Sequence, residues 1–403
     1  MLRAGELAAD RIKELDSMLA LAVFLCGALT AGYIFIGYPI CLKFVAKWRA
    51  RPIVKGSTER SVSVVICVYN GAHFVRKKLR SLLEQNYPRE LMEILVLSDG
   101  STDGTDAIVR EFEDDGVQLI RLPHGGKPAA LNVGFARARN EILVLTDVRQ
   151  TLDRQCVRGL VGCFDDPQVG VVSGELAIRS GDTREEGDIG AYWRFESWMR
   201  RQLARVDSMF GATGPIYAIR RRLAVELPPE ILLDDMYLPL TAFFRGYRLV
   251  VEEQARAYDH PSKLDSEFPR KVRTLAGNLQ ILRYMPQLLG PKNRMWFHFV
   301  SYKLGRLTLP YLLIVVTISS FYLPGPWRLP ILMGIAGSFS LAVLDPWISQ
   351  RLPIKRISSP ARTFLVMMIA TVSAIRVFFV PPRKLWKEST IQPSARPAED
   401  TTR

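Results

Sequence analysis

Residues 18–44 form a nearly uncharged apolar run, and no other single feature constrains this chain as strongly. As a helix, the run is long enough to cross a hydrocarbon layer of about 30 Å. A secretory signal would have a shorter apolar stretch, and here lysines and arginines follow directly between residues 43 and 55. We therefore expect a retained membrane helix over residues 18–44, preceded by an N-terminal segment at residues 1–17.

Three further apolar runs lie near the other end of the chain, at residues 307–323, 329–348 and 364–380. The loop between the last two is basic, so the positive-inside rule places that loop in the cytoplasm. By the same rule, the basic residues that follow the run at residues 18–44 place the region after it in the cytoplasm. The first two runs then form a hairpin. The last run either crosses or lies partly in the interface, because Arg376 interrupts it.

These runs predict a C-terminal membrane region at residues 307–380 with two to three spans, followed by a polar tail at residues 381–403. Aromatic and basic residues mix at residues 290–306, which predicts an interfacial helix, with a buried amphipathic helix as the alternative. We expect an integral protein of the plasma (inner) membrane, with the region between the spans in the cytoplasm.

Charge and composition narrow the choice of partners. The 403 residues are 48% hydrophobic with a formal net charge of +14, which points to anionic partners. Much of the basic excess flanks apolar runs, where it faces membrane lipids, so nucleic acid is not an expected partner. The five cysteines lack paired or metal-ligand spacing, which indicates a reduced compartment.

Residues 56–280 alternate short apolar runs with amphipathic ones, as βαβ units do. Such units predict an α/β domain with a mostly parallel, Rossmann-like sheet, inserted between the transmembrane helices. Ligands bind such sheets at the carboxyl ends of the strands. The pattern predicts strands at residues 62–69, 93–97, 117–122, 142–146 and 170–176, and helices at residues 73–85, 104–112 and 128–137.

Five motifs follow one another in this region. They are VSVVICVYN at residues 62–70, SLLEQNYP at 81–88, LSDGSTDGT at 97–105, GKPAALN at 126–132, and Asp147. Together they resemble the family 2 inverting glycosyltransferases with a GT-A fold. The flanking spans resemble the membrane-embedded synthases of that family, such as those for cellulose, chitin, hyaluronan and poly-N-acetylglucosamine.

The resemblance implies a nucleotide-sugar donor, with a UDP-sugar expected, and a set of donor-binding residues. The base would pack on Tyr69 and Asn70, and Asp99 would accept a hydrogen bond from the uracil ring. Lys127 would bind the diphosphate at a helix start. The alternative for Asp99 is a turn residue that caps the next helix, although Asp103 fits that role better. The alternative for Lys127 is a solvated lysine.

Asp147 matches the first acid of the family's DxD metal site, which implies Mg²⁺ or Mn²⁺ as cofactor. The chain departs from the motif two residues later, where Arg149 stands in place of the second acid. Either Asp147 with phosphate oxygens and water holds the metal, or Arg149 itself supports the leaving diphosphate. We expect the metal to be used. His124 is interpreted only as a loop residue.

Asp235 matches the general base of the family, which takes the acceptor proton during inversion. Asp234 is expected either to contact the acceptor or to cap the helix. Gly211, Thr213 and Gly214 resemble the acceptor loop, for which a tight turn into a strand is the alternative. Arg273 matches the arginine of the QxxRW motif and would stabilise departing UDP, but the motif's Gln and Trp are absent.

Because the motif's Trp is missing, the sequence does not decide which acceptor receives the sugar. One hypothesis is a synthase that extends a polysaccharide or oligosaccharide, with the spans on both sides forming an exit path. The second is a single transfer to a lipid acceptor. The third is a non-catalytic assembly subunit, and the retained acidic and basic residues argue against it.

Overall fold

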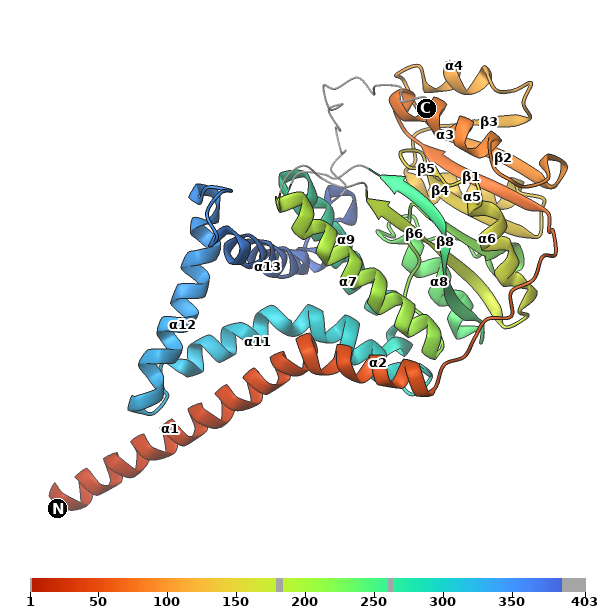
Figure 1. Cartoon of the computed structure of the whole chain (residues 1–403). Helices are drawn as coiled ribbons and strands as arrows, with labels where there is room; N and C mark the ends of the chain where they lie inside the picture. Colours follow the sequence, from red (N-terminus) through yellow and green to blue (C-terminus); the bar gives the residue numbers. More distant parts are fainter. Residues whose placement is uncertain (1, 179–183, 260–263, 386–403) are drawn as a thin grey trace.

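An eight-stranded sheet lies at the centre of the region between the first and the later spans. The computed structural model describes residues 2–178, 184–259 and 264–385 (Figure 1). Within these ranges the strand order is β3-β2-β1-β4-β7-β6-β8-β5. The strands are β1 (Val62–Val68), β2 (Met92–Asp99), β3 (Val117–Leu122), β4 (Ile142–Asp147), β5 (Thr151–Leu152), β6 (Val169–Ile178), β7 (Ile216–Arg220) and β8 (Arg248–Asp259).

One half of the sheet, β3-β2-β1-β4, is entirely parallel. Val62 of β1 stands opposite Met92 on one side and Ile142 on the other, so the three strands run in step to the same edge. The β1 run is buried at six of its seven residues, as expected for a parallel strand covered on both faces. The parallel pattern predicted for this half is confirmed.

The other half is mixed. Strand β7 runs antiparallel to both β4 and β6, β6 pairs with β8 in parallel, and β5 closes the edge antiparallel to β8. Of this half, only β6 is predicted by the apolar pattern. The sheet as a whole is mixed but mostly parallel, and the GT-A class is confirmed.

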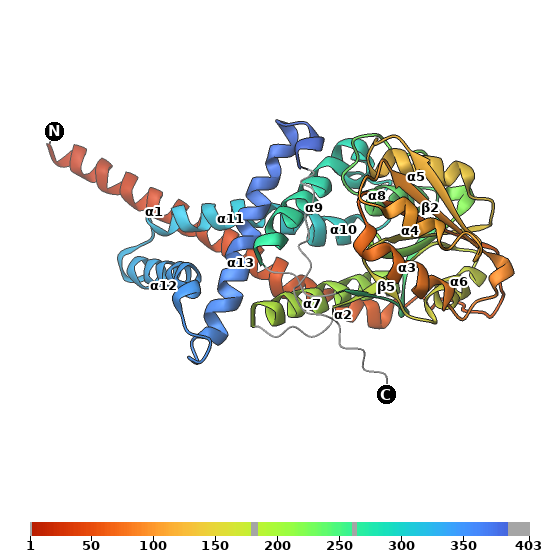
Figure 2. The same ribbon diagram turned by 90° about the horizontal axis from the view of Figure 1, so that it is seen from above.

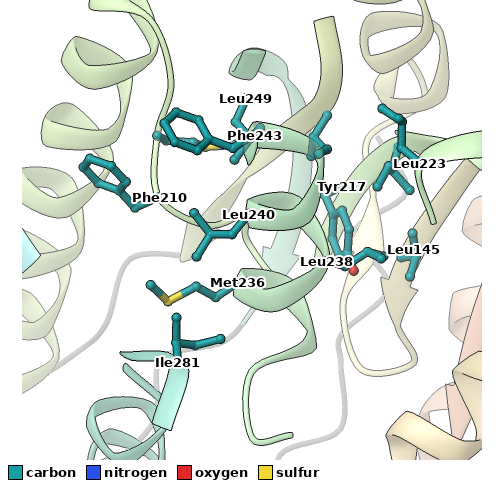
Figure 3. Close-up of a cluster of buried hydrophobic side chains, with 14 of the residues drawn as sticks. Leu145, Phe210, Tyr217, Leu223, Met236, Leu238, Leu240, Phe243, Leu249 and Ile281 are labelled. Carbon is teal, nitrogen blue, oxygen red and sulfur yellow. The ribbon is translucent and has the colours of Figure 1, made fainter. Parts of the chain in front are cut away.

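Helices cover both faces of the sheet and form a hydrophobic core with each. Helices α3, α4 and α6 pack on one face. Helices α5, α7, α8 and α9 pack on the other, where α8 lies at the centre of the cluster in Figure 3. These helices are α3 (Ala72–Leu83), α4 (Thr105–Arg110), α5 (Lys127–Arg137), α6 (Cys156–Gly162), α7 (Arg184–Val206), α8 (Asp234–Phe244) and α9 (Leu264–Tyr284).

The described part of the chain has four helical segments that are long and apolar enough to cross a membrane: Leu15–Trp48, Trp296–Ser320, Gly325–Trp347 and Lys355–Phe378. The first joins α1 (Leu2–Gly32) to α2 (Tyr38–Trp48) through a π-helical turn, η1 (Tyr33–Gly37). The second joins α10 (Trp296–Phe299) to α11 (Gly305–Ser320) through another, η6 (Val300–Leu304). The remaining two contain α12 (Gly325–Leu344) and α13 (Lys355–Ala374).

The spans are continuous with the sheet domain's core. Tyr38 and Leu42 of α2 and Phe299 and Tyr302 of the second span are buried in the same cluster as the β1 and β4 side chains. Helix α1 packs along α11, and both extend away from the sheet (Figures 1 and 2). Helix α13 packs on α9 and α7. The membrane part is therefore docked firmly on one face of the sheet.

The segment expected as an interfacial helix at residues 290–306 is helical from Trp296 onward. It forms the first turns of a helix that runs without a break from Trp296 to Ser320. His298 and Phe299 are buried while Trp296 and Phe297 are exposed, so the helix is amphipathic, as both alternatives expect. Helix α1 also extends through the predicted N-terminal segment, to Leu2. Of the predicted polar tail at residues 381–403, residues 386–403 lie outside the described ranges.

Candidate active site

Three of the predicted donor residues lie at one edge of the parallel half, where β1, β2 and β4 end. Asn70 follows β1, Asp99 is the last residue of β2 and Asp147 the last of β4. In a parallel sheet these carboxyl ends meet, so residues far apart in the sequence become neighbours.

Asn70 links the ends of β1 and β2. Its φ of 49° is the left-handed conformation that Asn tolerates better than most residues. Its side-chain oxygen accepts a hydrogen bond from the Thr102 N–H at 2.8 Å. Asp103 then accepts hydrogen bonds from the N–H groups of Thr105 and Ala72, at the starts of α4 and α3. Capping at Asp103, the reading preferred from the sequence, matches the geometry.

The Asp99 carboxylate is turned toward the glycine loop before α5. It accepts hydrogen bonds from the N–H groups of Gly125 at 2.7 Å and of Gly126 at 3.0 Å. His124 Nδ1 lies 3.1 Å from the same carboxylate, and the His124 ring lies against Tyr69 with 4.4 Å between centroids and an angle of 31° between the ring planes. Gly100 has a φ of 72°, and a Cβ there would lie 2.9 Å from the His124 backbone N. Sequence reasoning missed this role for His124.

Lys127, the first residue of α5, bridges two carboxylates. Its Nζ lies 3.1 Å from Asp147 Oδ1 and 3.2 Å from Asp234 Oδ1. Burial alone would lower the pKa of Lys127, but Asp147, Asp234 and Asp235 outweigh it and hold the pKa above its ordinary value. Asp234 thus pairs with Lys127, and its side chain does not cap α8, because Leu233 stands at the cap position.

Asp235 lies beside Asp234 at the start of α8. Burial, reinforced by the Asp234 charge, raises the pKa of Asp235 to about 6. Gly214 lies against it, since a Cβ built on Gly214 would be 2.9 Å from Asp235 Oδ2 and 3.9 Å from Asp147 Oδ2. The backbone therefore passes between two carboxylates, and only glycine leaves that space open.

The loop around Gly211 and Thr213 is held by an arginine that carries no motif. Arg200 of α7 donates hydrogen bonds to Thr213 Oγ1 and, at 2.8 Å, to Ser173 Oγ. The Ala212 N–H donates to the Asp235 carbonyl at 2.7 Å, which joins the loop to α8. The strand β7 follows at Ile216, so the alternative of a turn into a strand describes the backbone correctly.

Arg149 forms an ion pair with Asp259, the last residue of β8, which also accepts a hydrogen bond from Gln150 Nε2 at 2.8 Å. Asp259 was also missed, because it lies 110 residues away in the sequence. No cluster of three or more His, Cys, Asp or Glu suited to a metal ion occurs in the described ranges. Asp147 and the buried, unpaired Asp234 Oδ2 nevertheless offer two carboxylates. These fit a cation completed by phosphate oxygens, as Mg²⁺ often is.

Lys78 supports the Asp147 loop from behind. It is completely buried on α3, and its Nζ donates to Thr146 Oγ1 at 2.6 Å and to the Gln150 carbonyl at 2.7 Å. Burial lowers the pKa of Lys78 to about 7. Its helical spacing places Lys78 on the apolar face of α3, between Val75 and Leu82. A lysine on that face is the sequence signal that could have indicated a buried role.

Most predicted residues share one cavity of about 910 Å³. Tyr69, Asn70 and Asp99 lie outside its lining, at the adjoining sheet edge. The predicted residues that line it are Lys127, Asp147, Gly211, Thr213, Gly214, Asp234, Asp235 and Arg273.

The same cavity reaches the spans. At that end it is lined by apolar side chains that include Ile34 and Phe35 of η1, Leu309 of α11, and Phe364 and Met368 of α13. Arg273 lies on α9 between the two ends. A single hollow therefore joins the carboxylates at the sheet edge to the membrane helices.

Comparisons with known proteins agree with this arrangement. Residues 63–227 match the family model described as glycosyl transferase family 2. Glycosyltransferase AglE of Haloferax volcanii is 32% identical over 236 residues, which cover 56% of this chain and 75% of AglE. The probable glycosyltransferase YdaM of Bacillus subtilis is 26% identical over 263 residues, covering 60% of this chain and 62% of YdaM.

The fold is also that of a solved glycosyltransferase. The mannosyltransferase PcManGT from Pyrobaculum calidifontis, solved in complex with GDP-Man and Mn²⁺, superposes with a TM-score of 0.69. The match covers 89% of this chain and 99% of PcManGT, at 20% sequence identity. With the motifs, the GT-A sheet and these relatives together, the chain belongs to glycosyl transferase family 2 and is an enzyme of that family.

Proposed function

We propose that the protein transfers a sugar, with inversion, from a nucleotide-sugar donor to a lipid acceptor that reaches Asp235 from the membrane. The observation that carries the proposal is the continuous cavity from Lys127, Asp147 and Asp235 to the spans. A site that opens onto apolar membrane helices suits an acceptor that carries a hydrocarbon chain.

The donor occupies the parallel half of the sheet. Its base packs near Tyr69 at the ends of β1 and β2, and its diphosphate approaches Lys127. The Asp99 carboxylate shapes this site by fixing the N–H groups of Gly125 and Gly126. A UDP-sugar remains our proposed donor, whereas PcManGT was solved with GDP-Man.

A divalent cation fits this end of the cavity. Asp147, with Asp234, would hold Mg²⁺ or Mn²⁺ against the donor phosphates, where the ion would neutralise charge on the leaving group. The Arg149–Asp259 ion pair keeps the arginine charge balanced within the protein. Arg149 is therefore a weaker candidate than Asp147 for contact with the diphosphate.

Asp235 acts as the general base. It removes the proton of an acceptor hydroxyl as that oxygen bonds to the anomeric carbon, while the bond from that carbon to the nucleoside diphosphate breaks. A pKa near 6 keeps the carboxylate ionised at neutral pH and basic enough to accept a proton. Lys127 and Arg273 balance the charge of the departing diphosphate.

The lining favours a lipid acceptor over a polysaccharide. Phe35, Phe364 and Met368 offer a hydrocarbon chain the apolar contact that it loses on leaving the bilayer. The absence of the motif Trp at residue 274, where Thr stands, removes a stacking platform for a growing sugar chain. The spans then deliver the acceptor laterally.

The test uses the full chain in lipid nanodiscs with radiolabelled UDP-sugars and GDP-sugars, followed by separation of lipid-extractable product from ethanol-insoluble polymer. We expect label in the lipid fraction, and none with Asp235→Asn. Label in long polymer, dependent on Asp235, would support the polysaccharide alternative. Absence of Asp235-dependent label with any donor would contradict the proposal as a whole.

A further inference from the structure

The two π-helical turns of the membrane region face each other at the mouth of the cavity. Tyr33 Oη of η1 lies 2.8 Å from Ser301 Oγ of η6. A Cβ on Gly305, just after η6, would lie 3.2 Å from the Ile34 side chain, so the two turns are in close contact. Both turns contribute lining residues. Such turns occur often at functional sites, where they redirect side chains.

One of the side chains that η6 directs into the cavity wall is Lys303. Lys303 Nζ lies 5.3 Å from the centroid of the Tyr302 ring. In the described part of the chain it has no ion pair or hydrogen bond. A half-buried ammonium at the membrane boundary is costly unless it pairs with an anion.

Glu196, the acid that acts most strongly on Lys303, is already engaged. Glu196 of α7 forms an ion pair with Arg306 at 2.5 Å and accepts a hydrogen bond from Tyr302. Arg306 also donates to Tyr192 Oη at 2.9 Å. Glu196 therefore faces both Lys303 and Arg306, and Asp235 and Arg200 also act on Lys303, so, with Lys303 counted, basic side chains outnumber the carboxylates here by one.

The excess extends along the cavity. The side chains that line it include eight lysines and arginines and four carboxylates. Asp147, Asp234 and Asp235 lie around Lys127, and Arg149 is paired with Asp259, so Glu196 is the lining carboxylate that remains for the other basic side chains. The wall that faces the spans is thus basic, and it continues directly into the apolar lining at Phe35 and Phe364. A ligand that fills both parts carries an anionic group next to a hydrocarbon chain.

We propose that this wall is a binding site for the phosphate group of a phosphate-bearing lipid, with Lys303 as its main ligand and Arg306 as the second. An ammonium and a guanidinium are the side chains that bind phosphate in proteins. The hydrocarbon chain lies along η1 and α13. The inference rests on the proposed lipid acceptor and adds the chemical group by which that acceptor is recognised.

The test measures binding without any donor, so that it is independent of sugar transfer. Wild type, Lys303→Gln and Lys303→Arg are placed in phosphatidylcholine nanodiscs. Each is titrated with a C55 polyprenyl phosphate, the corresponding C55 alcohol, and inorganic phosphate. The matched control is Lys292→Gln, which removes an exposed lysine outside the cavity lining. UDP affinity reports on the integrity of the donor side.

We expect Lys303→Gln to weaken binding of the polyprenyl phosphate about tenfold or more, with Lys303→Arg close to wild type. Lys292→Gln and the UDP affinity of every variant should change less than twofold. Equal binding of the phosphate and the alcohol, or equal losses in Lys303→Gln and Lys292→Gln, would overturn the inference. Inorganic phosphate binding as tightly as the lipid would show a free-anion site and would also overturn it.

These outcomes are distinct from failure of the proposed function. A polymeric product from the transfer assay would reject the lipid acceptor, whereas Lys303-dependent lipid binding would still show the phosphate site. Lipid-extractable product together with lipid binding that does not depend on Lys303 would reject only the inference made here.

Discussion

The two halves of the sheet are built differently. In β3-β2-β1-β4, each site residue follows its strand directly, and neighbouring strands bring Asp99 and Asp147 to one edge. In β7-β6-β8-β5, the site depends on contacts between distant segments, such as Arg200 with Thr213 and Arg149 with Asp259. The site residues of the parallel half are placed by the local ends of their strands, whereas those of the mixed half are placed by contacts between segments that meet only in the folded domain.

The sharpest test of this comparison is Asp235, the proposed general base, whose proposed role concerns the acceptor and not the binding of the donor. Asp235→Asn should lower the transfer rate by about 10² to 10⁴ and leave donor affinity nearly unchanged. For the wild type, kcat should fall as pH drops below about 6, because protonation of Asp235 removes the base. The measurement is a pH series of initial rates together with UDP binding, with the exposed Glu230→Gln as control. Near-normal turnover by the Asn variant would reject the assignment.

A smaller loss is expected where the two halves meet. The Cβ of Gly214→Ala would press on the Asp235 carboxylate and displace it, so we expect kcat to fall roughly 10²-fold. Gly334→Ala, in α12, adds a methyl group with no neighbour within 4 Å and serves as the control. Rates of both variants at saturating donor provide the measurement. Equal rates would show that the gap between the carboxylates is not needed.

Substitutions of Arg149 test the proposal that a divalent metal binds near Asp147. We expect transfer to require Mg²⁺ or Mn²⁺, and Arg149→Asp to lower the metal concentration for half-maximal rate roughly tenfold, because it adds a carboxylate near Asp147. Arg149→Gln breaks the pair with Asp259 without adding an acid and is the control. Full wild-type activity in excess chelator would contradict the metal proposal.

The smallest expected effect is that of Lys78, which lies behind the donor site. Lys78→Met removes two hydrogen bonds to the Asp147 loop, and we expect donor KM to rise about threefold to tenfold. Lys77→Met, exposed on the same helix, is the matched control. Steady-state kinetics separate KM from kcat. Identical KM values in the two variants would assign Lys78 to packing alone.

The sequence predicted the first half of the domain well because its signals are local. Seven predicted runs from residue 62 to residue 147 match β1, α3, β2, α4, β3, α5 and β4 to within two residues at every end. Asp99, Lys127 and Asp147 were identified from the motifs that carry the family resemblance, and in the structure each ends a strand or begins a helix.

The rest of the fold could not be predicted in this way. Arg200 and Asp259 belong to α7 and β8, whose roles appear only when distant segments pack. Lys78 has the spacing of a core residue, and its polar contacts come from a loop about 70 residues further along. At the helix that begins at Trp296, His298 and Phe299 pack on the domain. The composition of that segment does not predict which of its residues are buried.

The central claim is that the acceptor reaches Asp235 through the apolar end of the cavity. It is tested most directly by replacing Phe364, which lines that end, with a photoreactive phenylalanine and irradiating during transfer from a radiolabelled donor. Phe339, exposed on α12 and outside the lining, carries the same replacement as control. The account predicts lipid-extractable label crosslinked at 364 and none at 339. Equal crosslinking at both positions, or none at 364 while labelled product accumulates, would contradict it.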